Sequence, residues 1–356
     1  MIIDEFALQE LDLILRHPYR IAYQSISRSR LIFLRLTTNT GLAGFGCAAP
    51  EEEITGESFE GALSFLDGEV REHIVGSDPL RRLRLLEVLR KRSADSPSVL
   101  AAVDMALLDL LGKTTGLPVW KLFGGYRRGI PTSITIGIAS LEETLDQARD
   151  MMGRGFGIIK LKGGLSPEED AEKLIRLREI GGAELRLRFD ANQGYSVPDT
   201  LNFLSLAEPA GLEILEQPTP RSEPFLLGQI VRQIETPVMA DESLMTLHEA
   251  FHLAQNELVD MMNIKLMKVG GFNPARRIAA VSAAAGLETM IGCMDEPGLG
   301  IAAGLHFALS QENIAYADLD SFLDLEDDPS SEAVLLSKGV LYPRSGPGFG
   351  TAVDIF

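Results

Sequence analysis

The sequence has few of the residues that build covalent or metal–thiolate frameworks. Its 356 residues include only two cysteines, Cys47 and Cys293, which lie far apart and outside any CxxC spacing. Such usage excludes a disulfide-stapled fold and a thiolate zinc site. The first twenty residues carry acids early and no sustained apolar run, so they match neither a signal peptide nor a membrane span. These absences favour a protein of the reducing cytoplasm.

Positive charge is also in short supply. The chain has 33 Lys and Arg against 51 Asp and Glu, a formal net charge of −18. This balance repels nucleic-acid phosphates and anionic membranes and favours cations. We therefore expect neither a nucleic-acid nor a membrane partner. The hydrophobic content of 45% is ordinary for a globular chain of this length, which excludes disorder.

What the sequence does contain, from about residue 131 onward, is a recurring short apolar run. The runs are SITIG, GIIKLKG, LRLRFDAN, LEILEQP, PVMADES, MMNIKLMK, ETMIGCM and AYADLD. Their centres lie roughly 24 to 29 residues apart, the length of a strand plus a helix. Because the runs are nearly continuously apolar, they fit parallel strands buried on both faces. Eight such units predict an α/β fold, a (β/α)8-type (modified TIM) barrel at residues 126–320.

The two ends of the chain lack this repeating strand–helix pattern. Residues 1–125 contain the alternating run LIFLRLTT, the glycine-rich turn GLAGFG and the helix-like segment AAVDMALLDLLGKTTG. We interpret them as a separate α+β domain. The tail, residues 321–356, has turn residues and no further strand–helix unit. We expect it to return to the N-terminal domain.

Charged and amide side chains end six of the predicted strands. Barrel enzymes carry their active sites at this rim, and a buried charge is rarely tolerated unless it is paired. We therefore expect these groups to converge. In chain order they are Lys160 and Lys162, Asp190 and Asn192, Glu216 and Gln217, Asp241 and Glu242, Lys265, and Asp318 with Asp320.

Three carboxylates stand on successive strands: Asp190, Glu216 and Asp241. Together they form an all-oxygen set that suits a hard cation with open positions for water and substrate, and Mg²⁺ is the natural occupant. The alternative for each acid is that it caps the following helix. Three such acids in a row at one rim favour the metal.

The lysines at this rim point to proton transfer. Lys160 and Lys162 are two residues apart, so they share one strand face. We expect like-charge repulsion and a nearby cation to depress the pKa of both, making one a base near neutrality. Lys265, three to four strands further round, would approach from the opposite side. Bases on both faces of a carbon acid can invert a stereocentre, whereas Lys268 lies beyond its strand and is expected to be ordinary. The alternative of snorkelling surface lysines fits poorly with such apolar runs.

The motifs KLK, FDAN, EQP, ADES, NIKLMK and the final DLD, in this order and spacing, resemble the enolase superfamily, specifically its muconate-lactonizing-enzyme subgroup. The resemblance covers nearly the whole chain. Within that subgroup, the GCM turn and the DxD pair are similar to the dipeptide epimerases. The roles that the resemblance implies are Mg²⁺ binding for Asp190, Glu216 and Asp241, acid–base catalysis for Lys162 and Lys265, electrostatic assistance for Lys160, and binding of the substrate's α-ammonium for Asp318 and Asp320.

The chemistry of the residues agrees with those roles. A carbon acid beside a carboxylate loses its proton to an amine only if the developing enediolate is stabilised, which Mg²⁺ and Lys160 would do. A dipeptide offers a carboxylate to the metal and an ammonium to Asp318 and Asp320. We therefore predict a Mg²⁺-dependent epimerase that acts by 1,1-proton transfer, and the resemblance implies that the transfer occurs at the C-terminal residue. Asn192, Gln217 and Glu242 are expected to support the metal ligands.

By resemblance, loops at residues 17–27 and 48–56 set specificity. Gln24 stands where relatives acting on Ala-Glu carry an arginine, which argues against that substrate. The acids Glu51, Glu52, Glu53, Asp295 and Glu296 predict an acidic pocket mouth that attracts a Lys or Arg side chain. The competing interpretation is that they share the overall negative charge. The residues expected at the pocket are Gln24, Glu51, Thr135, Cys293, Met294 and Asp295.

Other interpretations remain open at this point. A lyase of the same superfamily, either a cycloisomerase or an o-succinylbenzoate synthase, and an N-acylamino acid racemase would use the same metal ligands and lysines. Dehydration, however, needs only one base. A non-catalytic descendant is disfavoured because no metal or lysine position is missing. A homo-oligomer is also expected.

Two short motifs suggest different chemistry. His248 to His252 reads HEAFH, the HExxH pattern of zinc peptidases, but on a helix away from the strand ends. Gly298, Gly300 and Gly304 form a glycine-rich turn whose spacing is wrong for a dinucleotide site. We expect that helix N-terminus to line the substrate pocket instead.

Overall fold

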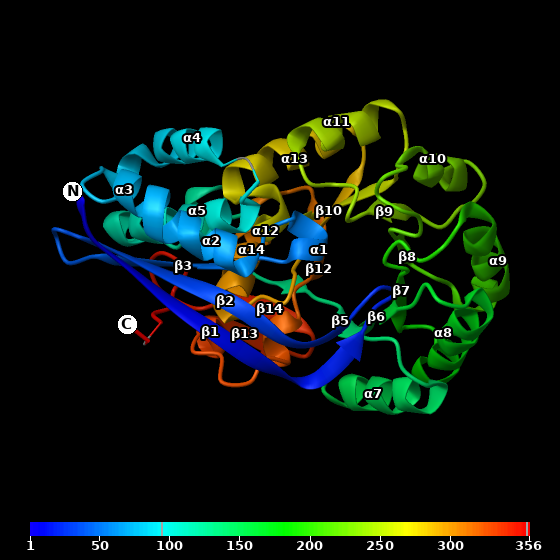
Figure 1. Ribbon diagram of the computed structural model, residues 1–356. Helices are drawn as coiled ribbons and strands as arrows, with labels where there is room; N and C mark the ends of the chain where they lie inside the picture. The colour runs from blue at the N-terminus through cyan, green and yellow to red at the C-terminus, as the bar shows by residue number, and fades with distance from the viewer. Residues whose placement is uncertain (94, 354) are drawn as a thin grey trace.

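The computed structural model describes residues 1–93, 95–353 and 355–356. Its N-terminal part is a three-stranded antiparallel sheet, β1 (Ile3–Arg20), β2 (Ser25–Thr38) and β3 (Ala43–Ala48), covered by helices (Figure 1). The helices, in chain order, are α1 (Glu52–Thr55), α2 (Phe59–Phe65), η1 (Leu66–Val70), α3 (Arg71–Ile74), η2 (Pro79–Arg81), α4 (Arg82–Arg92), α5 (Pro97–Thr115) and α6 (Val119–Leu122). We call β1–β3 and α1–α6 the capping domain.

Close packing of α5 on β3 explains the glycine-rich turn of the sequence. A Cβ on Gly44 would lie 2.3 Å from the Ala106 carbonyl oxygen, and one on Gly46 would lie 2.0 Å from that of Ala102. Only glycine permits the strand to approach the helix backbone this closely. The sheet can therefore bury its inner face directly against α5.

Eight parallel strands form the second part, in chain order around a nearly closed barrel. They are β5 (Ile134–Ile136), β6 (Ile158–Lys162), β7 (Arg186–Asp190), β8 (Ile214–Glu216), β9 (Val238–Ala240), β10 (Met261–Lys265), β11 (Glu288–Gly292) and β12 (Ile314–Asp318). The Ser133 N–H donates to the Ala317 carbonyl at 3.1 Å, which joins the first strand to the last. All eight predicted strands are present, and the predicted barrel is confirmed.

The outer helices begin where the sequence places capping residues. Ser140, Ser196 and Thr246 each accept a hydrogen bond from the backbone N–H three residues on and start α7, α9 and α11. Among the described residues, no helix is long and apolar enough to cross a membrane. The helices are α7 (Leu141–Gly153), α8 (Pro167–Gly181), α9 (Val197–Ala207), η3 (Glu208–Ala210), α10 (Phe225–Val231), α11 (Leu247–Gln255), α12 (Leu266–Val269), α13 (Phe272–Ala285) and α14 (Gly298–Ser310).

The tail lies against both parts. It forms η4 (Ser321–Leu323), η5 (Ser331–Ala333), β13 (Val334–Ser337) and β14 (Val340–Pro343), with β14 pairing to β4 (Ile130–Pro131). The segment after β14 is held by Asp109, a buried residue of α5. The Asp109 carboxylate accepts hydrogen bonds from the backbone N–H of Phe349 in this segment, at 3.0 Å, and from that of Phe45 in β3, at 3.1 Å. One carboxylate thus fixes the tail to the capping domain.

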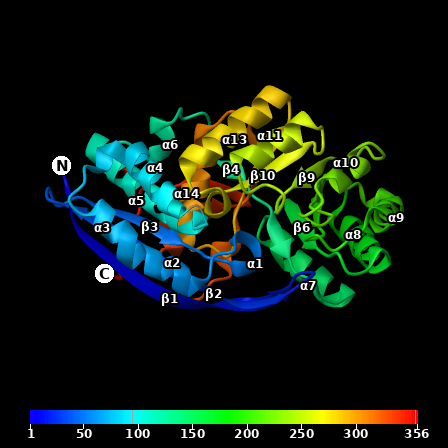
Figure 2. The same cartoon turned by 45° about the horizontal axis from the view of Figure 1, so that its top comes forward.

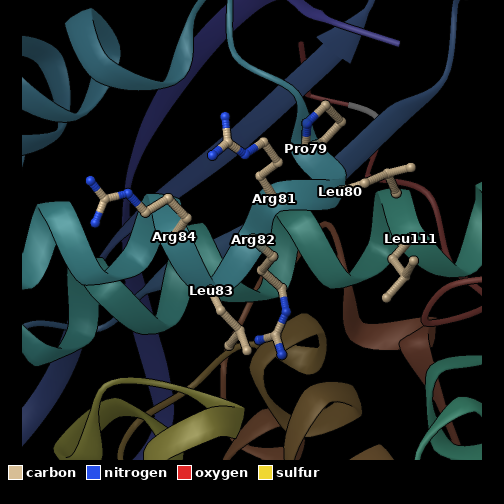
Figure 3. A pocket seen from close by; sticks show the side chains of 7 residues that line it. All are labelled: Pro79, Leu80, Arg81, Arg82, Leu83, Arg84 and Leu111. Carbon is tan, nitrogen blue, oxygen red and sulfur yellow. The ribbon is translucent and has the colours of Figure 1, made fainter.

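A second joint links the capping domain to the barrel. Arg82 extends from α4 toward the barrel side, beside a hollow of about 290 Å³ that Leu80 and Leu83 line on the outer surface (Figure 3). Its guanidinium pairs with buried Asp104, which also accepts a hydrogen bond from the Phe272 N–H at 2.7 Å. This hollow lies outside the site described below.

The β1–β2 hairpin reaches over the barrel mouth, as both overall views show (Figures 1 and 2). The Ile138 N–H donates to the Arg20 carbonyl at 2.8 Å, just after β5. His17 contacts Asp324 through Nδ1 at 2.7 Å, just after β12. The hairpin therefore closes one side of the space above the strand ends.

Candidate active site

A cavity of about 640 Å³ lies between the β1–β2 hairpin and the carboxyl ends of the barrel strands. The strand-end groups that line it are Lys160, Lys162, Asn192, Asp241, Glu242, Lys265, Asp318 and Asp320. All six residues that the sequence places at the pocket line it as well, namely Gln24, Glu51, Thr135, Cys293, Met294 and Asp295. Strand register and loop geometry thus bring together groups that are up to about 300 positions apart in the chain.

Three buried carboxylates cluster beside the cavity, which Asp241 lines, and we call this cluster the floor. Asp190 ends β7, Glu216 ends β8, and Asp241 directly follows β9. One carboxylate oxygen of each residue lies within 4.8 Å of the other two. Burial raises the pKa of Glu216 to about 8, although Lys160 opposes the shift. An all-oxygen set of this kind fits a hard divalent cation, whose charge would favour the ionised carboxylates.

Lys160 lies among carboxylates. Its Nζ is 2.7 Å from Glu216 Oε2 and 3.0 Å from both Asp190 Oδ2 and Asp318 Oδ2. Burial lowers the pKa of this lysine, but the carboxylates more than offset burial and hold the pKa well above its usual value. The residues around Lys160 therefore act against the predicted depression of its pKa, because the nearest charges are acids.

Lys162 and Lys265 occupy opposite walls. Lys162 ends β6 and Lys265 ends β10, four strands away in an eight-strand ring, which is diametrically opposite. Lys162 Nζ lies 3.3 Å from Asn192 Oδ1 and 3.6 Å from Asp190 Oδ2. Lys265 Nζ donates to Asp241 Oδ2 at 2.7 Å. Burial lowers the Lys265 pKa, but Asp241 reverses the shift, so Lys265 is a strongly held ammonium in this structure.

Lys268 is not ordinary, contrary to expectation. It is 1% exposed, and its Nζ donates to both Asp241 Oδ1 and the Asp241 carbonyl oxygen. A third contact reaches the Asn263 carbonyl at 3.4 Å. A lysine inside the apolar run KLMKVGG could have suggested this burial, but the short helix α12 that turns it back toward β9 was not predicted.

The DxD pair begins at Asp318, the last residue of β12, and ends at Asp320, two residues beyond the strand. Asp318 accepts a hydrogen bond from Ser133 Oγ at 2.6 Å, and although burial alone would raise its pKa, Lys160 lowers it to about 2. Asp320 accepts one from the Thr135 N–H at 2.6 Å, while burial and Asp318 raise its pKa to about 7. Thr135 thus fixes Asp320 through its backbone, and the pair offers carboxylate oxygens to a cation in the cavity.

The supporting residues differ in what they do. Gln217 Oε1 accepts from the N–H groups of Asp241 and Ser243 at 3.0 and 3.1 Å, which fixes the turn after β9. Asn192 faces Lys162, as described above. Glu242 lines the cavity, and its Oε2 has no hydrogen-bond partner among the described residues. Burial raises the pKa of Glu242 to about 7.

The predicted acidic mouth is smaller than the sequence suggested. The Asp295 carboxylate accepts from the Tyr19 hydroxyl at 3.0 Å through both oxygens. Glu296 is 2% exposed and turned to the Met294 N–H at 3.1 Å, so it is not at the mouth. Glu51 lines the cavity, and burial raises its pKa. The remaining two acids of the prediction, Glu52 and Glu53, do not line it.

Tyr19 and Tyr23 were not singled out from the sequence, although both lie within the predicted loop 17–27 and line the cavity. Three further lining acids were also missed, namely Asp324 of the tail and two acids of α7, Asp146 and Asp150. Nothing in the local sequence marks the two α7 acids, because α7 looks like any amphipathic helix. Only the closure of the barrel brings them to the mouth.

Neither rival motif forms a site. In α11, the Glu249 carboxylate caps its own helix through the Thr246 N–H at 2.7 Å, and His252 packs on the Phe225 ring. The HExxH pattern therefore has no zinc geometry, and the only metal-like cluster among the described residues is the floor triad.

The expectation that the N-terminus of α14 lines the pocket is wrong. Its Gly298 and Leu299 N–H groups are taken by Asp328 Oδ2 at 2.7 Å and Ser330 Oγ at 2.9 Å, both from the tail. Tail residues therefore satisfy the donors that a phosphate or substrate would need.

Comparison with known proteins agrees with this geometry. Residues 6–124 match the N-terminal domain model of the mandelate racemase / muconate lactonizing enzyme family, and residues 143–355 match the enolase C-terminal domain-like model. A relative named L-Lys-D/L-Arg epimerase, from Desulforapulum autotrophicum, is 39% identical over 98% of this chain and 99% of its own. A hydrophobic dipeptide epimerase from Enterococcus faecalis is 35% identical over 94% of this chain and 95% of its own.

Among solved structures, a dipeptide epimerase from Methylococcus capsulatus complexed with Mg and the dipeptide L-Arg-D-Lys is 37% identical. It superposes with a TM-score of 0.91 over 98% of this chain and 99% of its own. The matched domains, the strand-end residues and these relatives lead to one assignment. The chain belongs to the muconate-lactonizing-enzyme group of the enolase superfamily and, within it, to the dipeptide epimerases.

Proposed function

We propose that this enzyme epimerises dipeptides by 1,1-proton transfer at the α-carbon of the C-terminal residue. The observation that carries the proposal is the placement of Lys162 and Lys265 on opposite walls of one cavity, above the carboxylate floor. Relatives with dipeptides and Mg in their solved structures support the same reaction class. A lyase would need only one of the two lysines as a base.

Mg²⁺ fits the floor, where Asp190, Glu216 and Asp241 would hold it; once bound, it would neutralise the substrate carboxylate and the charge of the enediolate. Lys160 adds a fixed ammonium beside the same floor. One lysine of the facing pair takes the α-proton, and the other, as an ammonium, returns a proton to the opposite face. Exchange of roles between Lys162 and Lys265 accounts for reaction in both directions.

The DxD pair would select a free amine. Asp318 and Asp320 place two carboxylates within the same cavity, and a dipeptide's α-ammonium would form charge-assisted hydrogen bonds to them. The nitrogen of an N-acylated amino acid is uncharged, so it would leave the carboxylates uncompensated. This arrangement favours a dipeptide over an N-acylamino acid.

The charge of the cavity favours dipeptides with cationic side chains. Nine lining residues are Asp or Glu and five are Lys or Arg, a net of −4 for these groups (5 − 9). Glu51 faces the cavity from the 48–56 loop, and Gln24 supplies no positive charge for an acidic side chain. The similarity to an L-Lys-D/L-Arg epimerase points the same way. We infer that Glu51 is the main acceptor for a Lys or Arg side chain.

We infer a cytoplasmic setting from the two cysteines. Cys47 is buried, Cys293 lines the cavity, and both are free thiols, which suits a reducing cytoplasm. The homo-oligomer stays a prediction, to be tested by light scattering.

The proposal is tested by incubating a library of L,L-dipeptides with enzyme and Mg²⁺ in D₂O. Mass spectrometry should find incorporation of one deuteron into Lys- and Arg-containing dipeptides, followed by appearance of the L,D product on a chiral column. Initial rates with L-Lys-L-Arg should exceed those with L-Ala-L-Glu by about 10-fold or more, on the scale of one desolvated charge pair. Absence of deuterium in every dipeptide would refute the epimerase proposal, and faster reaction of Ala-Glu would refute the cationic preference alone.

A further inference from the structure

The two proton-transfer lysines are supported unequally, and an aromatic ring of the capping domain lies beside the one with the longer contacts. Lys265 Nζ has a strong ion pair, 2.7 Å from Asp241 Oδ2. Lys162 has only longer contacts, 3.3 Å to Asn192 Oδ1 and 3.6 Å to Asp190 Oδ2. The ring of Tyr19 lies above Lys162, with Nζ 5.9 Å from the ring centroid. We propose that Tyr19 is a positioning residue for Lys162, an inference that rests on the proposed function.

Contacts on two further sides hold Tyr19 in place. Its hydroxyl donates to Asp295, 3.0 Å from both carboxylate oxygens. Its Cβ lies where a side chain at Gly137 would begin, 2.7 Å from a Cβ built there, so only glycine leaves room for it. The N–H of the next residue, Ile138, binds the Arg20 carbonyl at 2.8 Å. The ring is thus fixed relative to β5, the turn after β11 and Lys162 together.

Asp295 is itself well placed to be an anchor. Its backbone carbonyl accepts from Ser29 Oγ at 2.8 Å, so one residue of the barrel turn binds two points of the hairpin. Burial raises the Asp295 pKa and also raises that of Tyr19, which keeps the phenol protonated as the donor. A carboxylate that serves as the anchor of Tyr19 has less capacity left for a substrate cation.

An aromatic face suits a lysine that must alternate between base and acid. The ring quadrupole attracts an ammonium lying over it, yet it offers no lone pair that accepts the proton. It would therefore hold the side chain toward the cavity without competing for the transferred hydrogen. Asp241 does not hold Lys162 in position, because its carboxylate lies at the opposite wall and accepts a hydrogen bond from Lys265.

Single-lysine backgrounds separate the two faces. In Lys265→Ala only Lys162 can exchange the α-proton, and in Lys162→Ala only Lys265 can. Deuterium incorporation into each epimer of a saturating cationic dipeptide is followed by NMR in both backgrounds. Adding Tyr19→Leu should slow exchange about 10-fold in Lys265→Ala, a typical value for a partly buried cation–π contact, and less than about two-fold in Lys162→Ala.

Two companion variants calibrate the effect. Tyr19→Phe keeps the ring and loses the bond to Asp295, so exchange through Lys162 should fall by less than in Tyr19→Leu. Tyr126→Leu is the matched control, because Tyr126 is 56% exposed and carries Arg127 over its ring at 4.9 Å, in a surface pair remote from the cavity lining. It should leave exchange unchanged in both backgrounds.

Equal slowing in both single-lysine backgrounds would overturn the proposal, since it would show that Tyr19 only shapes the cavity. No slowing in either background would overturn it as well. Failure of the epimerase proposal looks different, because the wild-type enzyme itself would then incorporate no deuterium. If wild type exchanges and Lys265→Ala does not, Lys162 is no base and the role of Tyr19 falls with it. Thermal melts of each variant check folding.

Discussion

The charged groups at the floor of the active site and those at its mouth come from different kinds of structure. At the floor, each charged group lies at or next to the end of a barrel strand and is neutralised by a neighbour, as Lys160 is by three carboxylates at 2.7 to 3.0 Å. At the mouth, the acids come from distant loops and do different jobs. Asp295 anchors Tyr19, Glu296 is buried, and Glu51 faces the cavity. Regular structure thus fixes the chemical groups of the site, whereas the loops determine which substrates fit.

Removing either proton-transfer lysine should lower the epimerisation rate more than any other change considered. Lys162→Ala and Lys265→Ala should each lower the epimerisation rate by about 10³-fold or more, because each removes a base or acid needed for inversion. Chiral chromatography of the dipeptide product measures the loss. Lys91→Ala, an exposed lysine paired with Glu87 on α4, serves as the control and should react normally. More than a tenth of wild-type rate in either catalytic variant would contradict the account.

The DxD pair after the last barrel strand should recognise the substrate's ammonium group. Asp320→Asn should lower kcat/KM for a dipeptide by about 100-fold at most, the cost of one charge-assisted contact, while still accepting the bond from the Thr135 N–H. An N-acetylated dipeptide lacks the ammonium, so wild type should lose a similar factor with it. The variant should then show no further loss. Additive losses would mean that Asp320 acts elsewhere.

The mouth should give a smaller and more selective effect. Glu51→Gln should lower kcat/KM for Lys- and Arg-containing dipeptides by about 10-fold and leave neutral dipeptides unchanged, because one carboxylate partner of the side chain is lost. Competition between L-Ala-L-Lys and L-Ala-L-Leu in one reaction provides the measurement. A uniform loss across both substrates would show that Glu51 shapes the loop rather than reading charge.

Glu296 should matter to stability rather than to catalysis. Burial raises its pKa to about 7, so the folded protein binds more protons than the unfolded chain between about pH 4.5 and 7, and the free energy of unfolding falls as pH rises through that window. Glu296→Gln should remove this fall, a gain of up to about 3 kcal/mol at pH 8 and almost none at pH 4. Urea unfolding at the two pH values measures it, and an equal change at both would refute the burial argument.

Much of the floor could be predicted from the sequence because strand periodicity fixes it. A polar residue that ends an apolar run must reach the barrel rim, so Asp190, Glu216 and Asp241 could be grouped without coordinates. The directions of the lysine pKa shifts could not be predicted from the sequence, because they depend on which charge lies nearest in space. Lys160 has carboxylates closer than any lysine, and they act against the expected direction.

The mouth was harder to predict for a physical reason. Which way Asp295 and Glu296 point depends on a turn whose partners, Tyr19 and Ser29, lie about 270 residues away. No local pattern in the sequence encodes such a contact. The prediction for Lys268 was wrong for a related reason. The short helix α12 after β10 brings its side chain into contact with Asp241, and no local pattern indicates this. Loop position was therefore predictable, and loop side-chain orientation was not.

The central claim is that two lysines work from opposite faces of one α-carbon, and single-lysine exchange tests it most directly. Each variant, Lys162→Ala or Lys265→Ala, is incubated with Mg²⁺ and each epimer of a cationic dipeptide in D₂O. The account predicts complementary behaviour, in which each variant exchanges the α-proton of one epimer only and the two variants choose opposite epimers. Exchange of the same epimer by both variants, or of both epimers by one, would contradict it.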